Sequence, residues 1–222
     1  MNDSNSYYSS PLDPEISSSV SRPYDNLHTL LSWFHGLLIL SSAWYCYKVF
    51  GGAAEACYVL PCYEGPGLQA LWKVNKGVTF TGESSGVFSL THALVGWWLV
   101  TYHKMAHAFV MGVLAGCTLC ASLLSWNMIW VWGAEWNLLG DLTLLNPNNT
   151  IFDESGRHMT INRPLISVFQ QLFYLSVAIC ALQSGILIQF LVNGSTWIRT
   201  FRIRAEEQTS SLVDELTPLQ RT

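Results

Sequence analysis

The chain has 222 residues, of which 50% are hydrophobic and 12% are charged, and its formal net charge is −4 at pH 7. The charged share is about half of that in an average soluble domain, so a soluble globular protein is a poor fit. The mild net charge and the lack of a Lys/Arg block exclude nucleic acid as an expected partner.

The N-terminal segment is polar. Residues 1–22 are rich in Ser, Asn, Asp and Pro and lack the apolar run of a cleavable signal peptide. We therefore expect the first apolar stretch to act as its own insertion signal. We also expect two disordered cytoplasmic tails, residues 1–24 and 198–222, because they hold too little apolar surface to offset the entropy of ordering.

Between the tails, residues 25–197 contain four long apolar stretches without an acidic residue, at about 28–50, 85–103, 106–132 and 165–192. Each has roughly 19 to 28 residues, enough for a helix to cross a hydrocarbon core of about 30 Å. The sequence therefore predicts an all-α fold: a bundle of four transmembrane helices with a short inner turn, two outer loops and disordered tails.

The positive-inside rule orients this bundle. Arg199, Arg202 and Arg204 follow the fourth span, and Lys104 lies in the short turn between the second and third spans. This places both tails in the cytoplasm. The opposite loops hold four basic residues of their own, so the orientation depends on the denser C-terminal cluster.

Cysteines in the first outer loop, 51–84, fit an oxidising lumen. Cys57 and Cys62 flank a turn that contains Pro61, and we expect them to form a local disulfide. Two free thiols are the alternative, because spacing alone does not establish bond geometry, and Cys46 is a competing partner.

The second outer loop, 133–164, contains the sequon Asn148-Asn149-Thr150, which predicts a glycan on Asn148. Further sequons begin at Asn2 and Asn193. The predicted orientation leaves both in the cytosol, where they stay unmodified.

Tryptophans gather at the outer end of the third span, as Trp126, Trp130, Trp132 and Trp136. Indole rings prefer the membrane interface, so we expect this cluster to anchor the helix at that depth. Stacking on sugar or lipid head groups is the alternative.

Small residues recur along the third and fourth spans and predict close helix packing. In the third span they are Ala108, Gly112, Gly116 and Cys120, and in the fourth they are Ser176, Cys180 and Ser184 with Gly185 on an adjacent stripe. Packing within the bundle is the favoured interpretation. A surface for self-association or for a partner's transmembrane helix is the alternative.

Two histidines lie inside spans, His35 in the first and His92 in the second. A pair of intramembrane imidazoles can clamp a haem. However, the two lie at about 10 Å and about 16 Å from the inner ends of their spans, which predicts a staggered pair. Hydrogen bonds to neighbouring hydroxyls, such as those of Ser32, Ser89 or Thr91, are the favoured alternative.

The chain offers little catalytic chemistry. It has no buried carboxylate, no serine nucleophile with a matching base and no phosphate-binding glycine loop. Cys117-x-x-Cys120 lies in the middle of a span, where desolvation disfavours a thiolate. We therefore expect no enzymatic activity, no cofactor and no metal.

In layout the chain resembles small four-span proteins with cytoplasmic tails, namely the MARVEL-type proteins of vesicles and junctions and the CD20-like family. The segment 28–33, His-Thr-Leu-Leu-Ser-Trp, is similar to the start of the synaptogyrin branch of MARVEL proteins. The resemblance covers topology over about 170 residues, contains no diagnostic motif and transfers no functional residue. The claudin pattern is not met, since Trp72 follows both loop cysteines.

The function that we expect is non-enzymatic: lateral organisation, trafficking or adhesion of other membrane proteins, in the plasma membrane or in secretory or endosomal membranes. The partners would be the lipid bilayer and transmembrane helices of other proteins or of a second copy. The first alternative is a haem-binding or proton-coupled redox protein that uses His35 and His92. The second is an auxiliary subunit of a channel or transporter.

Overall fold

The computed structural model describes the backbone of residues 14–54, 56–60, 74–102, 108–146, 148, 150–152 and 158–216. Within these ranges it describes the side chains between residues 29 and 194, apart from Tyr102, Ala108 and Phe152. The fold is mostly helical. Its elements, in chain order, are α1 (Pro14–Lys48), the π-helix η1 (Val49–Ala53), β1 (Val59–Leu60), α3 (Lys76–Tyr102), α4 (Ala108–Leu145), β2 (Thr150–Phe152), β3 (His158–Ile161) and α5 (Arg163–Leu216).

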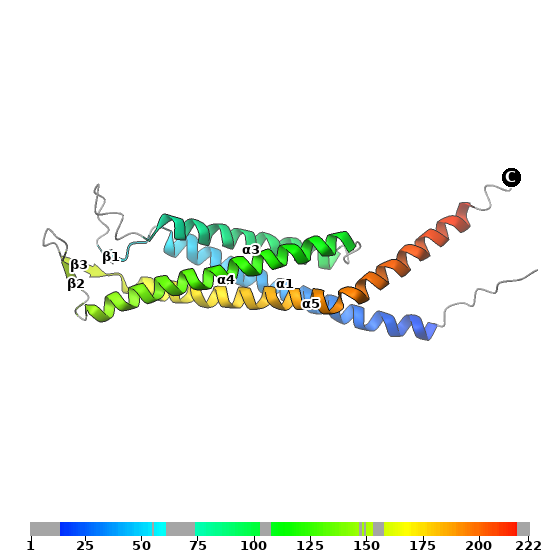
Figure 1. Cartoon of the computed structure of the whole chain (residues 1–222), viewed down its shortest axis with the longest axis horizontal. Helices are drawn as coiled ribbons and strands as arrows, with labels where there is room; N and C mark the ends of the chain where they lie inside the picture. The colour runs from blue at the N-terminus through cyan, green and yellow to red at the C-terminus, as the bar shows by residue number, and fades with distance from the viewer. Residues whose placement is uncertain are drawn as a thin grey trace, which may run out of the picture.

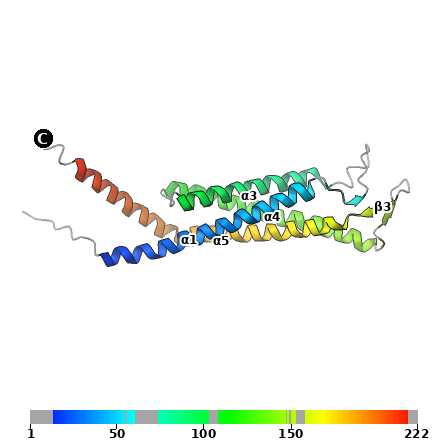
Figure 2. The same ribbon diagram turned by 180° about the vertical axis from the view of Figure 1, so that it is seen from behind.

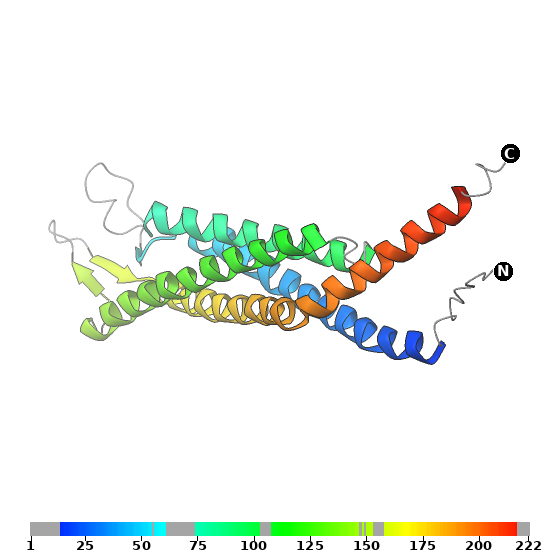
Figure 3. The same ribbon diagram turned by 45° about the vertical axis from the view of Figure 1, so that its right-hand side comes forward.

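The four α-helices lie side by side in one elongated bundle (Figure 1). The strands lie at one end, which we call the sheet end. Helix α1 begins and helix α5 finishes at the other, which we call the tail end (Figure 3). Helix α4 packs most extensively on α5, and α1 packs on both α3 and α5. Seen from behind, α1 runs across the bundle between these neighbours (Figure 2).

Two segments, Phe109–Leu145 of α4 and Arg163–Gly194 of α5, are long and apolar enough to cross a membrane. This result concerns length and composition, and it is compatible with membrane insertion. Within the described residues α1 and α3 do not meet the same test; each carries a buried histidine, which lowers the hydropathy of its segment. The structure thus confirms a helical bundle, and four membrane crossings stay a prediction.

The helices are longer than the predicted spans. Helix α3 begins at Lys76 rather than at 85, because the Asn75 side-chain oxygen accepts a hydrogen bond from the Gly77 amide at 2.8 Å and caps the helix. Helix α4 continues to Leu145 rather than ending at 132.

The predicted disordered tails are partly helical, which corrects that expectation. Residues 14–24 belong to α1, and 198–216 belong to α5. The second segment contains Arg, Ala, Glu and Gln between 202 and 208, residues with high helix propensity, so it extends a helix that packing has already nucleated. Residues 1–13 and 217–222 lie outside the described residues.

The two predicted outer loops pair with each other instead of lying apart. The three strands form an antiparallel sheet in the order β1-β3-β2, with Val59 opposite Ile161 and Phe152 opposite His158. Asn162 reinforces the junction, since its side-chain amide donates to the Cys57 carbonyl at 2.9 Å.

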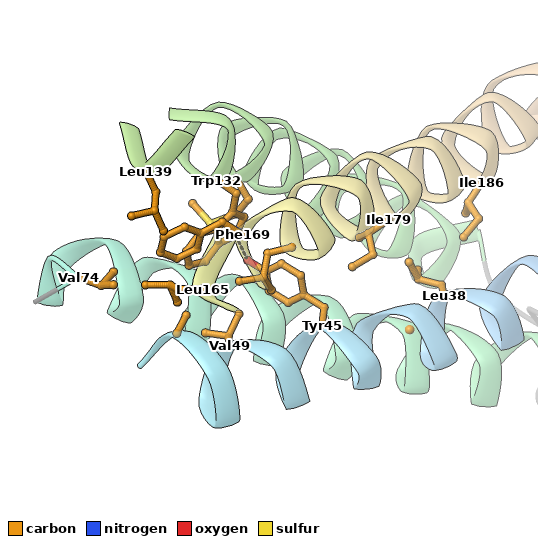
Figure 4. Close-up of a cluster of buried hydrophobic side chains, with 14 of the residues drawn as sticks. Leu38, Tyr45, Val49, Val74, Trp132, Leu139, Leu165, Phe169, Ile179 and Ile186 are labelled. Atoms are coloured by element: carbon orange, nitrogen blue, oxygen red, sulfur yellow. Dashed lines mark hydrogen bonds between the residues drawn. The ribbon is translucent and has the colours of Figure 1, made fainter. Parts of the chain in front are cut away.

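The core at the sheet end is built around Trp132, which corrects its expected role as an interfacial anchor. Its ring is 0% exposed, stacks on Phe169 at 5.9 Å between centroids, and donates from Nε1 to the Tyr45 hydroxyl at 2.8 Å (Figure 4). By contrast, Trp126 and Trp130 are exposed on the outside of the bundle, and their role as interfacial anchors stays a prediction. Trp132 therefore fixes helix packing rather than membrane depth.

The outside of the bundle is apolar on all four helices. Large hydrophobic side chains that are more than half exposed include Leu40 on α1, Phe80 on α3, Phe109 and Leu123 on α4, and Ile188 on α5. The interior instead holds polar side chains, among them His35, His92, Ser125 and Gln183. An apolar outside around a partly polar inside is the distribution expected of helices in lipid.

Candidate functional site: a buried histidine pair in a polar core

The structure brings His35 of α1 and His92 of α3 together. Their side chains are 0% and 6% exposed, and their ring centroids are 6.2 Å apart with the planes inclined at 42°. The expected stagger therefore does not separate them. Imidazole side chains reach several ångströms along a helix axis, and helix tilt shifts their relative heights.

Each histidine has one hydrogen-bond partner. His35 Nδ1 lies 2.8 Å from the Leu31 carbonyl oxygen in its own helix, and His92 Nε2 lies 2.9 Å from Thr118 Oγ1 on α4. These partners are not the neighbouring hydroxyls that we expected. The other ring nitrogens, His35 Nε2 and His92 Nδ1, are buried and have no hydrogen-bond partner.

Gly96 of α3 makes room for the pair. A Cβ atom at this position would lie 2.3 Å from His35 Nε2, closer than any real contact. Only glycine lets α3 approach the His35 ring this closely. The backbone of α3 thus forms one wall of the histidine site.

Gln183 of α5 links three helices in the middle of the core. Its side-chain oxygen accepts from Ser125 of α4 at 2.9 Å, and its side-chain nitrogen donates to Ser89 of α3 at 3.2 Å. An amide in an apolar bundle needs such partners, and these hydrogen bonds hold the helices in register.

The predicted small residues of α5 lie close to other helices. Ser176 is buried, Cys180 Sγ lies 3.8 Å from the Ser122 carbonyl oxygen of α4, and Ser184 is half-buried. A Cβ added to Gly185 would lie 3.4 Å from the Phe34 ring of α1.

The predicted small residues of α4 lie differently. A Cβ added to Gly112 or Gly116 would meet nothing within 4 Å, and both residues and Cys120 are exposed. These residues therefore face away from the bundle, which is contrary to the favoured interpretation. The side chain of Ala108 lies outside the described residues.

The glycines that do permit close packing are on α3, and the sequence analysis missed them. A Cβ on Gly82 would lie 2.6 Å from Trp132, and one on Gly86 would lie 2.9 Å from both Tyr45 and Cys46. Their four-residue spacing was a visible signal. It was overlooked because Gly82 fell inside the predicted outer loop.

A cavity of about 290 Å³ opens between α3 and α4 beside the histidine pair. Apart from His92, its lining is almost entirely apolar and includes Phe88, Val95, Val113 and Cys117. His35 does not line it. The cavity lies on the side of α4 that carries the exposed Val113.

At the sheet end, the Tyr58 hydroxyl donates a hydrogen bond to the Glu135 carboxylate on α4. Burial, followed by this carboxylate, raises the pKa of Tyr58 above its ordinary value. Tyr58 also packs against Phe169 at 6.2 Å between ring centroids. These contacts fasten the first outer segment to the helices.

The predicted modification sites lie at this end too. Cys57 is bonded in a disulfide, and Cys46 is a free thiol, which removes Cys46 as the competing partner. Cys62 lies outside the described residues, so its pairing with Cys57 stays a prediction. Asn148 is exposed in the turn before β2 and is accessible to a modifying enzyme.

Among the residues that the structure describes, no group of three or more His, Cys, Asp and Glu side chains is arranged to hold a metal ion. The chain matches no protein-family model, and neither a curated protein nor a solved structure matches it. The likeness to MARVEL-type and CD20-like proteins therefore stays at the level of layout.

Proposed function

We propose that this chain is a four-span membrane protein that binds other membrane proteins through its helices and organises them laterally, without catalysing a reaction. The apolar outside supports four crossings. Large apolar side chains are exposed on α1 and α3 as well as on α4 and α5. Patches of this extent are costly in water and favourable in lipid.

The observation that carries the proposal is the outward face of α4. Gly112 and Gly116 are exposed and open at a helix position surrounded by apolar side chains. Without side chains there, a second helix can approach the backbone closely, which is how transmembrane helices associate in the absence of a hydrophobic driving force. The neighbouring cavity would receive a large side chain from that helix.

Photo-crosslinking in native membranes tests this proposal. A photoreactive residue replaces Val113, beside the glycines, or Leu40, which is exposed on α1. The Val113 probe should give discrete protein adducts and the Leu40 probe mainly lipid adducts. Gly116→Leu should abolish the discrete adducts by closing the approach.

Gly36→Leu is the matched control, because a Cβ at Gly36 also meets nothing within 4 Å and the residue lies on α1. It should leave the adducts of the Val113 probe unchanged. Adducts that are equal at both probe positions, or that survive Gly116→Leu, would contradict a binding face on α4. A single dedicated channel or transporter among the adducts would identify the auxiliary-subunit alternative.

The orientation is tested by glycosylation. With cytoplasmic tails, Asn148 lies in the lumen, and wild-type protein should show a glycosidase-sensitive shift in mobility that Asn148→Gln loses. Asn2→Gln should keep the shift. The reverse pattern would invert the protein and place Cys57 in the cytosol.

The histidine pair supports a second candidate, a haem or proton-coupled redox protein. Its support is the 6.2 Å separation between the two rings. Against a haem stand the close packing of His35 on Gly96 and the cavity beside His92, which His35 does not line. An absorption spectrum of the purified protein decides: a Soret band lost in His35→Ala supports haem, and a colourless protein excludes it.

A further inference from the structure

The two bare nitrogens of the histidine pair have a defined chemical state. A carbonyl oxygen only accepts hydrogen bonds, so His35 Nδ1, at 2.8 Å from the Leu31 carbonyl, carries the proton. In a neutral imidazole the other nitrogen is then unprotonated. His35 Nε2 is therefore a hydrogen-bond acceptor with a free lone pair, and it is buried without a partner.

The same reasoning fixes His92. The single hydroxyl proton of Thr118 is donated to the Leu114 carbonyl oxygen at 2.7 Å. The Thr118 oxygen must then accept from His92 Nε2, which lies 2.9 Å away and so carries the ring proton. His92 Nδ1 is a second buried lone pair without a partner.

Two acceptor atoms thus belong to rings whose centroids lie 6.2 Å apart, and neither has a donor. An unsatisfied polar atom in an apolar interior is strongly unfavourable, so each of these two nitrogens needs a hydrogen-bond donor. Rings at this separation are close enough for one small molecule that donates two hydrogen bonds to reach both.

Charge decides among the occupants. No charged residue occurs in 29–47, 84–102, 109–134 or 164–194, the segments that surround the pair. A metal cation would therefore be buried without a counter-charge, which is strongly unfavourable in an apolar medium. A water molecule is neutral and offers the two donors that the two lone pairs require.

We propose that the site between His35 and His92 binds one internal water molecule, which donates one hydrogen bond to His35 Nε2 and one to His92 Nδ1. Two further hydroxyls are buried and without a partner, those of Ser42 on α1 and Ser122 on α4. The proposed water site lies inside an uncharged bundle, and it is independent of the partner-binding face proposed on α4.

Nitrogen-15 NMR of histidine-labelled full-length protein in lipid nanodiscs tests the proposal, with signals assigned by single His→Gln variants. At neutral pH, His35 should be protonated at Nδ1 only and His92 at Nε2 only. Ring protons of both should show magnetisation transfer from water. His158, which is exposed in β3, is the positive control.

Thr118→Val removes the oxygen that fixes His92 and should convert that ring to a mixture of two tautomers, while Thr118→Ser should restore the single one. His35 bonds within its own helix, so its unchanged signal reports that the variants are folded. Two results of the wild-type measurement would overturn the proposal: no magnetisation transfer from water to the His35 and His92 rings, or a proton on His35 Nε2 or His92 Nδ1. Stoichiometric copper, zinc or haem in purified protein would do so as well.

Discussion

Two glycine pairs with the same four-residue spacing lie in opposite surroundings. On α3, added Cβ atoms at Gly82 and Gly86 would collide with the buried Trp132 and Tyr45 at 2.6 Å and 2.9 Å. On α4, the same change at Gly112 and Gly116 would meet open space. Small residues at this spacing give a helix a face that another helix can approach closely. Whether that other helix belongs to the same bundle depends on whether large side chains of neighbouring helices fill the space in front of the glycines.

The difference follows from how the interior is filled. Trp132 and Tyr45 are both buried and hydrogen-bonded to each other. Helix α3 therefore needs residues without a side chain where these two rings contact it. The outward face of α4 has no such neighbour within the described residues. The α3 pair therefore packs within this fold, whereas the α4 pair lies open on the outside of the bundle.

The largest effect that separates the two pairs is expected for Gly82→Ala. The new Cβ would lie 2.6 Å from a Trp132 ring that cannot withdraw, because it stacks on Phe169 and donates to Tyr45. We expect a loss of about 2 to 3 kcal/mol in the free energy of unfolding, typical of overpacking. Thermal denaturation in detergent measures it. Unchanged stability would show that α3 does not pack on Trp132.

The next effect concerns the fastening at the sheet end. Tyr58→Phe removes the hydrogen bond to the Glu135 carboxylate, and we expect a loss of about 2 kcal/mol, as for a bond to a charged group. Chemical denaturation at neutral pH measures the loss. Tyr174→Phe, at an exposed position, is the control and should have no effect.

The same residue predicts an alkaline pH dependence. The pKa of Tyr58 is raised in the folded state by burial and by Glu135, and the unfolded chain has an ordinary value of about 10. Above about pH 10 the unfolded state loses this proton and the folded state keeps it, so stability falls as the pH rises. The wild type should lose more stability above this pH than Tyr58→Phe; parallel profiles would contradict the burial of Tyr58.

Sequence patterns predicted the helices but not their ends. Apolar runs predict only the uninterrupted apolar part of a helix, and α3 and α4 continue past that part through polar residues such as Glu83 and Asp141. The strands are two to four residues long, too short for an alternating pattern to stand out, and β1 pairs with β3 across about a hundred residues of sequence.

Composition also marked the correct polar residues without their partners. His35 and His92 stood out because polar groups in an apolar span need hydrogen bonds. Which atoms supply them depends on helix tilt and rotation, so Thr118 on α4 could not be chosen from the sequence. The glycine at 96 gave no signal by itself, since its role is set by the His35 ring that it faces.

A smaller effect is expected for Gln183→Leu, which tests the polar interior. It removes hydrogen bonds to Ser89 and Ser125 and leaves two hydroxyls to find other partners. We expect a loss of about 1 kcal/mol, since such bonds between membrane helices are individually modest. Gln189→Leu is the control near the tail end. Among the described residues, the Gln189 side chain hydrogen-bonds to Asn193 of its own helix and to no other helix. Equal losses in both variants would argue against an interhelical role for Gln183.

The smallest effect is expected on the outward pair. Gly112→Ala adds a methyl group to open space and removes the conformational freedom of a glycine in a helix, so the monomer should be unchanged or stabilised by up to about 1 kcal/mol. The same denaturation assay as for Gly82→Ala measures it, which makes the two variants a matched pair. A loss as large as that of Gly82→Ala would mean that α4 is turned inward and that its glycines pack within the bundle. If purified oligomers lose stability while monomers do not, then the partner on this face is a second copy of the chain, because only then does the methyl group meet another helix.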